Sequence, residues 1–229
     1  MPDVFAVIVA AGRGTRMGGD VLKQYLDMGG LSILSRTLEV FILHRQIGRI
    51  YLVVPENDFD FCRKMVIAPL MGSGREIHLI AGGKTRFDSV ENGLAAIPAS
   101  EGIVLVHDGV RPFVTPDIIS ACMAEAVKTK ACIAAVPVAD TLKMVSNGRI
   151  TSTLERNSIF MAQTPQAFDL SLLKASFAFA RSTGFTATDE AALVEHYGKP
   201  VSIVAGSRAN IKITTPDDLA LARALLHLG

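Results

Sequence analysis

Short runs rich in β-branched residues alternate with longer amphipathic stretches along the chain. This alternation predicts parallel strands joined by crossover helices, which is the α/β class of fold. The runs are uninterrupted apolar segments, as expected for strands that helices cover on both faces of a sheet. The predicted strands span residues 4–10, 50–54, 77–81, 103–106, 132–136 and 201–204. The sequence therefore predicts a Rossmann-like, doubly wound and mostly parallel sheet.

The stretches between these runs carry signals of helix ends. Pro69 and Pro98 follow two of them and Gly184 follows a third, at positions where a helix is expected to stop. The last stretch begins at Pro216 and continues with two aspartates, which complement the positive end of a helix dipole. The predicted helices span residues 33–44, 58–68, 86–97, 116–130 and 170–182, with a final helix from residue 216.

One segment, residues 138–158, breaks the alternation. It contains Ser146-Asn147-Gly148 flanked by Thr, Val and Ile, and a central Asn-Gly pair is typical of a tight β-hairpin. An isolated two-stranded hairpin is marginal in water, so we expect a projecting arm that a partner surface stabilises. No linker or repeat divides the 229 residues. The prediction is a single domain over residues 1–229 with an arm at 138–158.

Charge and hydropathy exclude several classes of partner. The 23 basic and 22 acidic side chains give a net charge of +1, which is too balanced for binding a phosphate backbone, so nucleic acid is not expected. The purest apolar run, residues 4–11, is much shorter than the roughly 20 residues of a membrane-spanning helix. The first cation, Arg13, follows this run, whereas a signal peptide has its cations first. Three cysteines show no disulfide or metal spacing. We expect a cytoplasmic protein with no membrane contact.

The loop after the first predicted strand is a candidate phosphate site. Its glycines allow backbone N–H groups to converge on phosphate oxygens, and Arg13, Arg16 and Lys23 add positive charge for a triphosphate. The dinucleotide fingerprint fails because Met17 stands where its third glycine belongs, and the Walker pattern fails because Asp20 stands where its lysine belongs. The alternative interpretation is a flexible glycine loop with solvated cations.

Asp108 and Arg111 follow the fourth predicted strand. A carboxylate in this position can hold Mg²⁺ with help from substrate phosphates, because that ion keeps several waters and rarely needs an all-protein cage. Arg111 could clamp a second phosphate. The alternative is a structural aspartate that caps the turn with an arginine partner. His107 is expected to be packed, and the five histidines show no zinc spacing.

Polar residues also occur after the later strands. They lie in segments 140–143, 163–166, 188–190 and 210–214, each of which is ordinary for a loop when taken alone. Cations recur after the first, third, fourth and final strands, whereas acids are sparse there. No nucleophile has an evident base, and no G-x-S-x-G motif is present. The pattern indicates charge stabilisation, as in phosphoryl or nucleotidyl transfer.

Several motifs follow one another along nearly the whole chain. They are AAGRGTRM at 10–17, KQY at 23–25, GG at 82–83 with Arg86 and DSV at 88–90, VHD at 106–108 with RP at 111–112, DTLK at 140–143, AQTPQ at 162–166 and NIKIT at 210–214. Many sugar nucleotidyltransferases share the first motif. The set in this order resembles the 2-C-methyl-D-erythritol 4-phosphate cytidylyltransferase family of the non-mevalonate isoprenoid pathway.

This resemblance implies a nucleotidyltransferase-type sheet, CTP and 2-C-methyl-D-erythritol 4-phosphate as substrates, and Mg²⁺ or another divalent cation as cofactor. The residues implied to be catalytic are Arg16, Lys23, Arg156 and Lys212. The residues implied to bind substrate are Ala11, Gly12, Gly14, Gly83, Ser89, Asp108, Arg111, Thr141 and Thr164, and Asp108 is also the candidate metal ligand. The attacking group is already an anionic phosphate, so no general base is needed, and fixed cations position the two phosphates.

The resemblance also implies a homodimer paired through the arm, in which Thr141 and Arg156 serve the neighbouring subunit's site. The chain departs from the family at Leu22, where proline is usual, and this loses a fixed φ before Lys23. Two alternatives stay open at this point. One is a ribitol-5-phosphate cytidylyltransferase, and the other is a nucleotide-binding module without catalysis.

Overall fold

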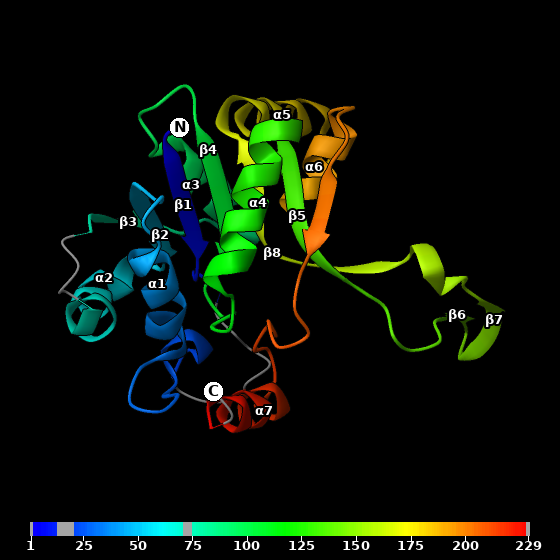
Figure 1. The fold of residues 1–229 in the computed structure, drawn as a ribbon, viewed down its shortest axis with the longest axis horizontal. Helices are drawn as coiled ribbons and strands as arrows, with labels where there is room; N and C mark the ends of the chain where they lie inside the picture. The colour runs from blue at the N-terminus through cyan, green and yellow to red at the C-terminus, as the bar shows by residue number, and fades with distance from the viewer. Residues whose placement is uncertain (1, 13–20, 71–74, 228–229) are drawn as a thin grey trace.

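A seven-stranded sheet organises the part of the chain that the computed structural model describes, residues 2–12, 21–70 and 75–227. The strand order is β3-β2-β1-β4-β8-β5-β9, and only β8 runs antiparallel to its neighbours (Figure 1). The strands are β1 (Val4–Val9), β2 (Arg49–Val54), β3 (Ile77–Ala81), β4 (Ile103–Asp108), β5 (Ala131–Pro137), β8 (Phe160–Asp169) and β9 (Ser202–Ala205). The mostly parallel, doubly wound sheet is confirmed, and all six predicted strands are present.

The strand β8 corrects the sequence analysis, which assigned residues 163–166 to a loop after a strand. They lie inside β8, between β4 and β5. Two features hid the strand, namely its polar side chains and Pro165, which has no N–H for the ladder. The register of β5 against β8 shifts between Ile133 and Ala135, beside the proline, and the Thr164–Pro165 bond is cis. A bulge in the pairing therefore accommodates a residue that normally excludes a central strand.

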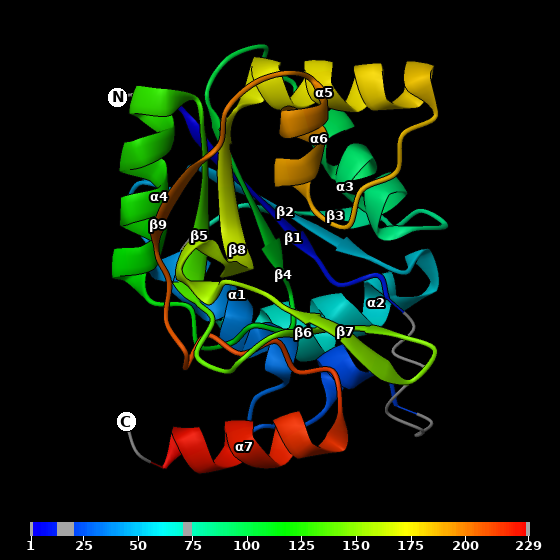
Figure 2. The ribbon, with the colours of Figure 1, turned by 90° about the vertical axis from the view of Figure 1, so that its right-hand side faces the viewer.

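Helices cover both faces of the sheet, as Figure 2 shows. The described helices are α1 (Ile33–Leu43), α2 (Phe59–Phe61), α3 (Arg86–Ala95), α4 (Pro116–Thr129), α5 (Leu170–Thr183), α6 (Glu190–His196) and α7 (Pro216–Leu226). The last of them, α7, covers neither face, because it packs in a separate cluster with Met28, Ile33 and Val110. Alternate residues of β1 point to opposite faces, so Ala6 and Ile8 pack with α1 and α4, whereas Phe5 and Val7 pack with α3, α5 and α6. The uninterrupted apolar runs of the sequence reflect this two-sided burial.

The helix ends largely follow the sequence signals. Thr85 and Asp88 form a reciprocal capping box at the start of α3, Pro116 opens α4, and Gly184 ends α5 at a φ of 66°. Two expectations were wrong in detail. The single helix predicted over 58–68 is a 3₁₀ turn, a short α-helix and a π-helix at Cys62–Ile67 in succession, and a second 3₁₀ turn, Ala68–Leu70, continues through Pro69 where the helix was expected to stop. The helix α6 was not predicted.

The arm is confirmed as a hairpin of β6 (Lys143–Ser146) and β7 (Arg149–Thr153) that extends away from the sheet (Figure 1). Its turn places Asn147 at a φ of 49° and Gly148 at 73°, which is why Asn-Gly is suited to it. Every residue of both strands is exposed, including Val145 and Ile150. That the whole chain forms a single domain stays a prediction. None of the described helices combines the length and apolar character needed to cross a membrane.

Candidate active site

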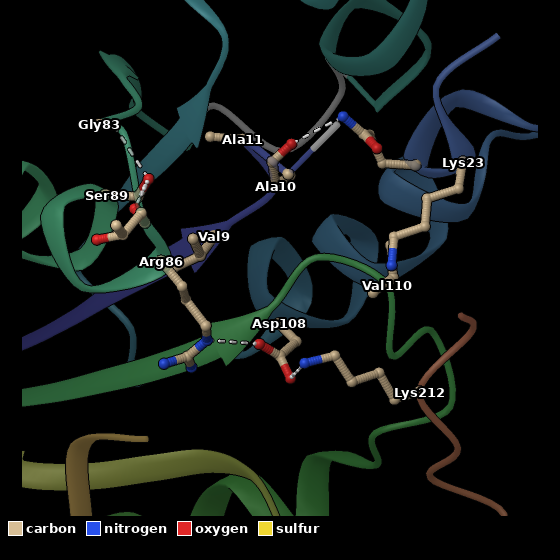
Figure 3. A pocket seen from close by; sticks show the side chains of 13 residues that line it. Val9, Ala10, Ala11, Lys23, Gly83, Arg86, Ser89, Asp108, Val110 and Lys212 are labelled. Carbon is tan, nitrogen blue, oxygen red and sulfur yellow. Dashed lines mark hydrogen bonds and ion pairs between the residues drawn. The ribbon is translucent and has the colours of Figure 1, made fainter. Parts of the chain in front are cut away.

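A pocket opens at the carboxyl ends of β1 and β4, where doubly wound sheets bind ligands (Figure 3). It contains about 590 Å³ of space including its open mouth, within the usual range for small-molecule sites. Its described lining residues are Val9, Ala10, Ala11, Gly12, Lys23, Gln24, Gly83, Thr85, Arg86, Ser89, Asp108, Val110 and Lys212. Segments that are far apart in the sequence thus meet because their strands end at one edge.

Asp108 stands at the centre of a cluster of cations. Its Oδ2 lies 2.9 Å from Nζ of Lys212 and 3.4 Å from Nε of Arg111, and its Oδ1 accepts a hydrogen bond from Nε of Arg86 at 3.2 Å. Asp108 is 6% exposed. Burial raises the pKa of this carboxyl, but the positive charges of Arg86, Lys212 and Arg111 outweigh it and hold the pKa well below its usual range. Asp108 is therefore an anion that three cations surround.

Arg86 is fixed from its other side by Glu190. Its Nη1 and Nη2 donate hydrogen bonds to the two Glu190 carboxylate oxygens at 2.6 and 3.0 Å. Glu190 is 1% exposed, and burial is the largest influence on its pKa and raises it, although the Arg86 charge opposes this rise. The guanidinium thus bridges two buried carboxylates, and a bidentate arginine pair of this kind fixes geometry as well as charge.

A second pocket lies against the first and shares Arg86, Asp108 and Lys212 with it. Its other lining residues are Arg111, Ala162, Gln163, Thr164, Gln166, Thr188 and Asp189. The shared residues form an ion-paired wall with a pocket on each side. This arrangement can hold two ligands next to one another, with fixed cations between them.

Side chains of β8 hold the loops around the second pocket. Gln163 Nε2 donates to the Ser207 carbonyl at 2.8 Å, and Gln166 Nε2 donates to Asp189 at 2.9 Å at the start of α6. Thr164 Oγ1 accepts a hydrogen bond from the Asp108 N–H at 3.1 Å. The polar residues that concealed this strand in the sequence therefore position the site.

The far end of the first pocket has no space for larger side chains. A Cβ on Gly83 would lie 2.2 Å from Cβ of Asp88, and one on Gly82 would lie 2.2 Å from Cβ of Ala11. Ser89 Oγ accepts a hydrogen bond from the Gly83 N–H at 3.1 Å and donates to the Thr85 carbonyl at 2.8 Å. Gly83 therefore presents its backbone to the pocket, and a glycine without a Cβ allows a ligand to approach closely there.

This geometry is chemically suited to anions. Lys23, Arg86 and Lys212 line one pocket, and Arg111 joins Arg86 and Lys212 in the other. Fixed cations of this kind stabilise charge that develops on phosphate oxygens without having to reorganise. The arrangement fits transfer between two phosphorylated substrates.

Comparison with known proteins agrees with this chemistry. The 2-C-methyl-D-erythritol 4-phosphate cytidylyltransferase family matches residues 4–228. The chain belongs to this family. A relative with that name from Geobacter metallireducens is 45% identical over 226 residues, covering 97% of each chain, and one from Syntrophotalea carbinolica is 46% identical, covering 97% of this chain and 96% of the relative. 

Solved cytidylyltransferase structures share the fold. The 4-diphosphocytidyl-2C-methyl-D-erythritol synthase of Anaerococcus prevotii has a TM-score of 0.86 at 33% identity, covering 99% of this chain and 96% of that one. The 2-C-methyl-D-erythritol 4-phosphate cytidylyltransferase of Thermus thermophilus has a TM-score of 0.80 at 32% identity, covering 98% and 99%. The fold resemblance inferred from the motifs is thereby confirmed.

The residues that the resemblance implied fall into three groups. The first pocket brings together Ala11, Gly12, Lys23, Gly83, Ser89, Asp108 and Lys212, and the second adds Arg111 and Thr164. Thr141 and Arg156 line neither pocket, because Thr141 lies between β5 and the arm strand β6, and Arg156 lies on the 3₁₀ turn Arg156–Ser158 after the arm strand β7. Gly14 and Arg16, together with Arg13, lie outside the described residues.

Two residues that shape the site of this cytidylyltransferase, Arg86 and Glu190, had no predicted role. Both residues lie in segments that the sequence analysis had singled out: Arg86 follows the Gly82-Gly83 pair, and Glu190 ends the polar segment 188–190. Nothing local joins them, because 104 positions separate the two residues. His107 was expected to be packed, and it is buried against Phe41 with a ring separation of 4.8 Å.

Proposed function

We propose that this chain transfers the cytidylyl group of CTP to 2-C-methyl-D-erythritol 4-phosphate. An oxygen of the methylerythritol phosphate attacks the α-phosphorus of CTP, the bond from that phosphorus to the bridging oxygen breaks, and pyrophosphate leaves with the electron pair. The products are 4-diphosphocytidyl-2-C-methyl-D-erythritol and pyrophosphate. The observation that carries this proposal is the wall of Arg86, Asp108 and Lys212 between two adjoining pockets.

The first pocket is proposed to hold CTP. Ala11, Gly12, Gly83 and Ser89 line it and offer the backbone atoms and small surfaces that a nucleoside needs. Lys23 is proposed to stabilise charge on the α-phosphate and the leaving pyrophosphate. Arg16 is proposed to act with it, on the evidence of the sequence motif.

The second pocket is proposed to hold methylerythritol phosphate. Asp108 and Thr164 offer acceptors for hydroxyl groups of the polyol, and Arg111 and Lys212 offer cations for its phosphate. Because Lys212 lines both pockets, it can hold the incoming phosphate beside the α-phosphate of CTP. Positioning of this kind removes much of the entropic barrier to a reaction between two anions.

The active form is proposed to be a homodimer paired through the arm, with Thr141 and Arg156 completing the partner's second pocket. The exposed apolar residues of the arm, among them Met144, Val145 and Ile150, support this proposal, because a hairpin this exposed is marginal without a covering surface. Mixing inactive Arg16→Ala and Arg156→Ala chains should then restore part of the activity. If subunits exchange and no activity returns, the sites are not shared.

The donor set around Asp108 does not fit a resident Mg²⁺ ion. Both carboxylate oxygens face cations, and no cluster of three His, Cys, Asp or Glu side chains suited to a metal occurs among the described residues. We propose that the divalent cation arrives with the triphosphate, whose oxygens are its preferred ligands. That Asp108 ligates the ion stays a prediction, since it requires Arg86 to release Oδ1, or both Lys212 and Arg111 to release Oδ2. Calorimetry distinguishes these two possibilities. Binding of Mn²⁺ alone would favour Asp108 as a ligand, whereas binding of Mn²⁺ only together with CTP would favour an ion that arrives with the triphosphate.

Pyrophosphate release in the presence of CTP, Mg²⁺ and methylerythritol phosphate tests the proposed function. Turnover that is absent at micromolar enzyme would contradict it. The same assay with ribitol 5-phosphate compares the values of kcat/KM, and a higher value for ribitol phosphate would assign the second pocket to that polyol instead.

A further inference from the structure

Lys23 lies on a short 3₁₀ turn, Lys23–Tyr25, whose backbone other side chains hold in place. A 3₁₀ turn has three residues per turn, so its three side chains point in three directions. Lys23 extends into the first pocket (Figure 3), and Gln24 is buried and donates from Nε2 to the Ala10 carbonyl at 2.9 Å. Tyr25 points elsewhere and is bonded to a different part of the chain.

The Tyr25 hydroxyl donates a hydrogen bond to Asp58 Oδ2 at 2.8 Å and lies 3.3 Å from Sγ of Cys62. Its ring packs on Phe61 with a centroid separation of 4.7 Å. Burial raises the pKa of Tyr25 above its usual value, and the bonds to Cys62 and Asp58 add to the rise. The hydroxyl therefore remains a neutral donor at any working pH.

These contacts join two strand ends. Asp58 ends the 3₁₀ turn Glu56–Asp58, which follows Pro55 directly after β2, whereas Gln24 is bonded to the residue after β1. The backbone of the Lys23 turn is thus held between the ends of two adjacent parallel strands. Leu22 has no ring to fix its φ, so at this point the conformation depends on these tertiary contacts.

We propose that Tyr25, through its hydrogen bond to Asp58, is a positioning residue for Lys23 in cytidylyl transfer. It acts through the backbone of the 3₁₀ turn, because residues two apart in such a turn do not share a face. The inference rests on the role of Lys23 in the proposed function. A displacement of the ammonium group by a fraction of an ångström weakens charge stabilisation in the transition state more than it weakens binding in the ground state.

A double-mutant cycle tests this inference. Tyr25→Phe removes only the hydroxyl, and we expect kcat to fall between about 10- and 100-fold while KM for methylerythritol phosphate changes less than threefold. Lys23→Ala is expected to lower kcat by a factor on the order of 10². If Tyr25 acts through Lys23, then Tyr25→Phe in the Lys23→Ala background has no further effect on kcat. Asp58→Ala should reproduce the Tyr25→Phe result.

Tyr197→Phe is the matched control, since it removes a hydroxyl from a tyrosine that lines neither pocket. It should keep normal kcat. A Tyr25→Phe enzyme with normal kcat overturns the inference, as does a double variant in which the two losses multiply. If Lys23→Ala itself keeps normal turnover, the proposed role of Lys23 fails instead. Thermal unfolding of each variant, with kcat expressed per folded enzyme, separates positioning from loss of fold.

Discussion

The ammonium group of Lys212 lies 2.9 Å from Oδ2 of Asp108, so a cation that serves both pockets is paired with a carboxylate before substrate arrives. Asp108 keeps Arg86 and Arg111 as further partners. We therefore predict that Lys212→Ala lowers kcat by a factor on the order of 10² or more. The free energy of unfolding should change by about 1 kcal/mol or less, because the pair is partly exposed on the lysine side.

Steady-state pyrophosphate release and chemical denaturation measure the two quantities separately. Lys199→Ala removes a cation that lines neither site pocket, so it should leave both kcat and the free energy of unfolding unchanged. A Lys212→Ala chain that loses stability in proportion to its activity would show that the pair serves the fold and not the reaction.

The bidentate pair of Arg86 and Glu190 predicts a large effect on stability. Glu190→Gln leaves one guanidinium edge without its anion, and breaking a buried pair by changing one partner costs about 3 kcal/mol or more. Glu195→Gln removes the same charge from an exposed position of α6 and should cost less than about 0.5 kcal/mol. Urea denaturation of both variants gives the comparison. Equal stabilities would mean that Glu190 is not ionised in the folded protein.

The buried His107 predicts a dependence of stability on pH. Burial lowers the pKa of His107 from 6.5 to about 4, so between these values the unfolded chain binds a proton that the folded chain does not. Stability is therefore lost as the pH falls from about 6.5 toward 4, and this one group contributes about 3 kcal/mol of the loss. His107→Gln should flatten the slope of unfolding free energy against pH in metal-free buffer. The exposed His227→Gln should keep it, and an unchanged slope in His107→Gln would refute the assignment.

The conformation of Leu22 predicts that proline is tolerated there. Its φ is −60° and its ψ is 135°, which a proline ring can adopt, and its N–H donates no hydrogen bond to another described residue. Leu22→Pro should stabilise the protein by about 0.4–1 kcal/mol, because the unfolded chain loses freedom. Leu26 has nearly the same φ, −62°, but its N–H donates to the Lys23 carbonyl at 3.2 Å.

Leu26→Pro is therefore the matched control and should destabilise the protein by at least about 1 kcal/mol. Thermal unfolding of the two variants provides the measurement. A Leu22→Pro chain less stable than the parent would indicate that the backbone before Lys23 adopts another conformation in solution.

The sequence predicted most of the fold because most of its elements are encoded by neighbouring residues. The side chains of the apolar run that forms β1 are buried on both faces of the sheet. The Asn147-Gly148 pair specifies a turn whose positive φ values few other residues adopt. These are local properties, so hydropathy periodicity and turn chemistry are sufficient to find them. The strand β8 was not predicted, because Pro165 and the glutamines of this segment are typical of a loop. Only pairing with β4 and β5 makes the segment a strand.

For the candidate site too, some properties were local to the sequence and others depended on tertiary contacts. The sequence by itself determined which residues were available at the strand ends, namely a glycine-rich loop with cations after the first strand and Asp108 after the fourth. The order of its motifs identified the family. Only the tertiary structure decided that Arg86 bridges Asp108 and Glu190, and that Lys212 lies between two pockets. The physical reason is that these contacts join residues from separate strand ends and loops, and the energy of such a pair depends on burial and distance. Both exist only after the chain has folded.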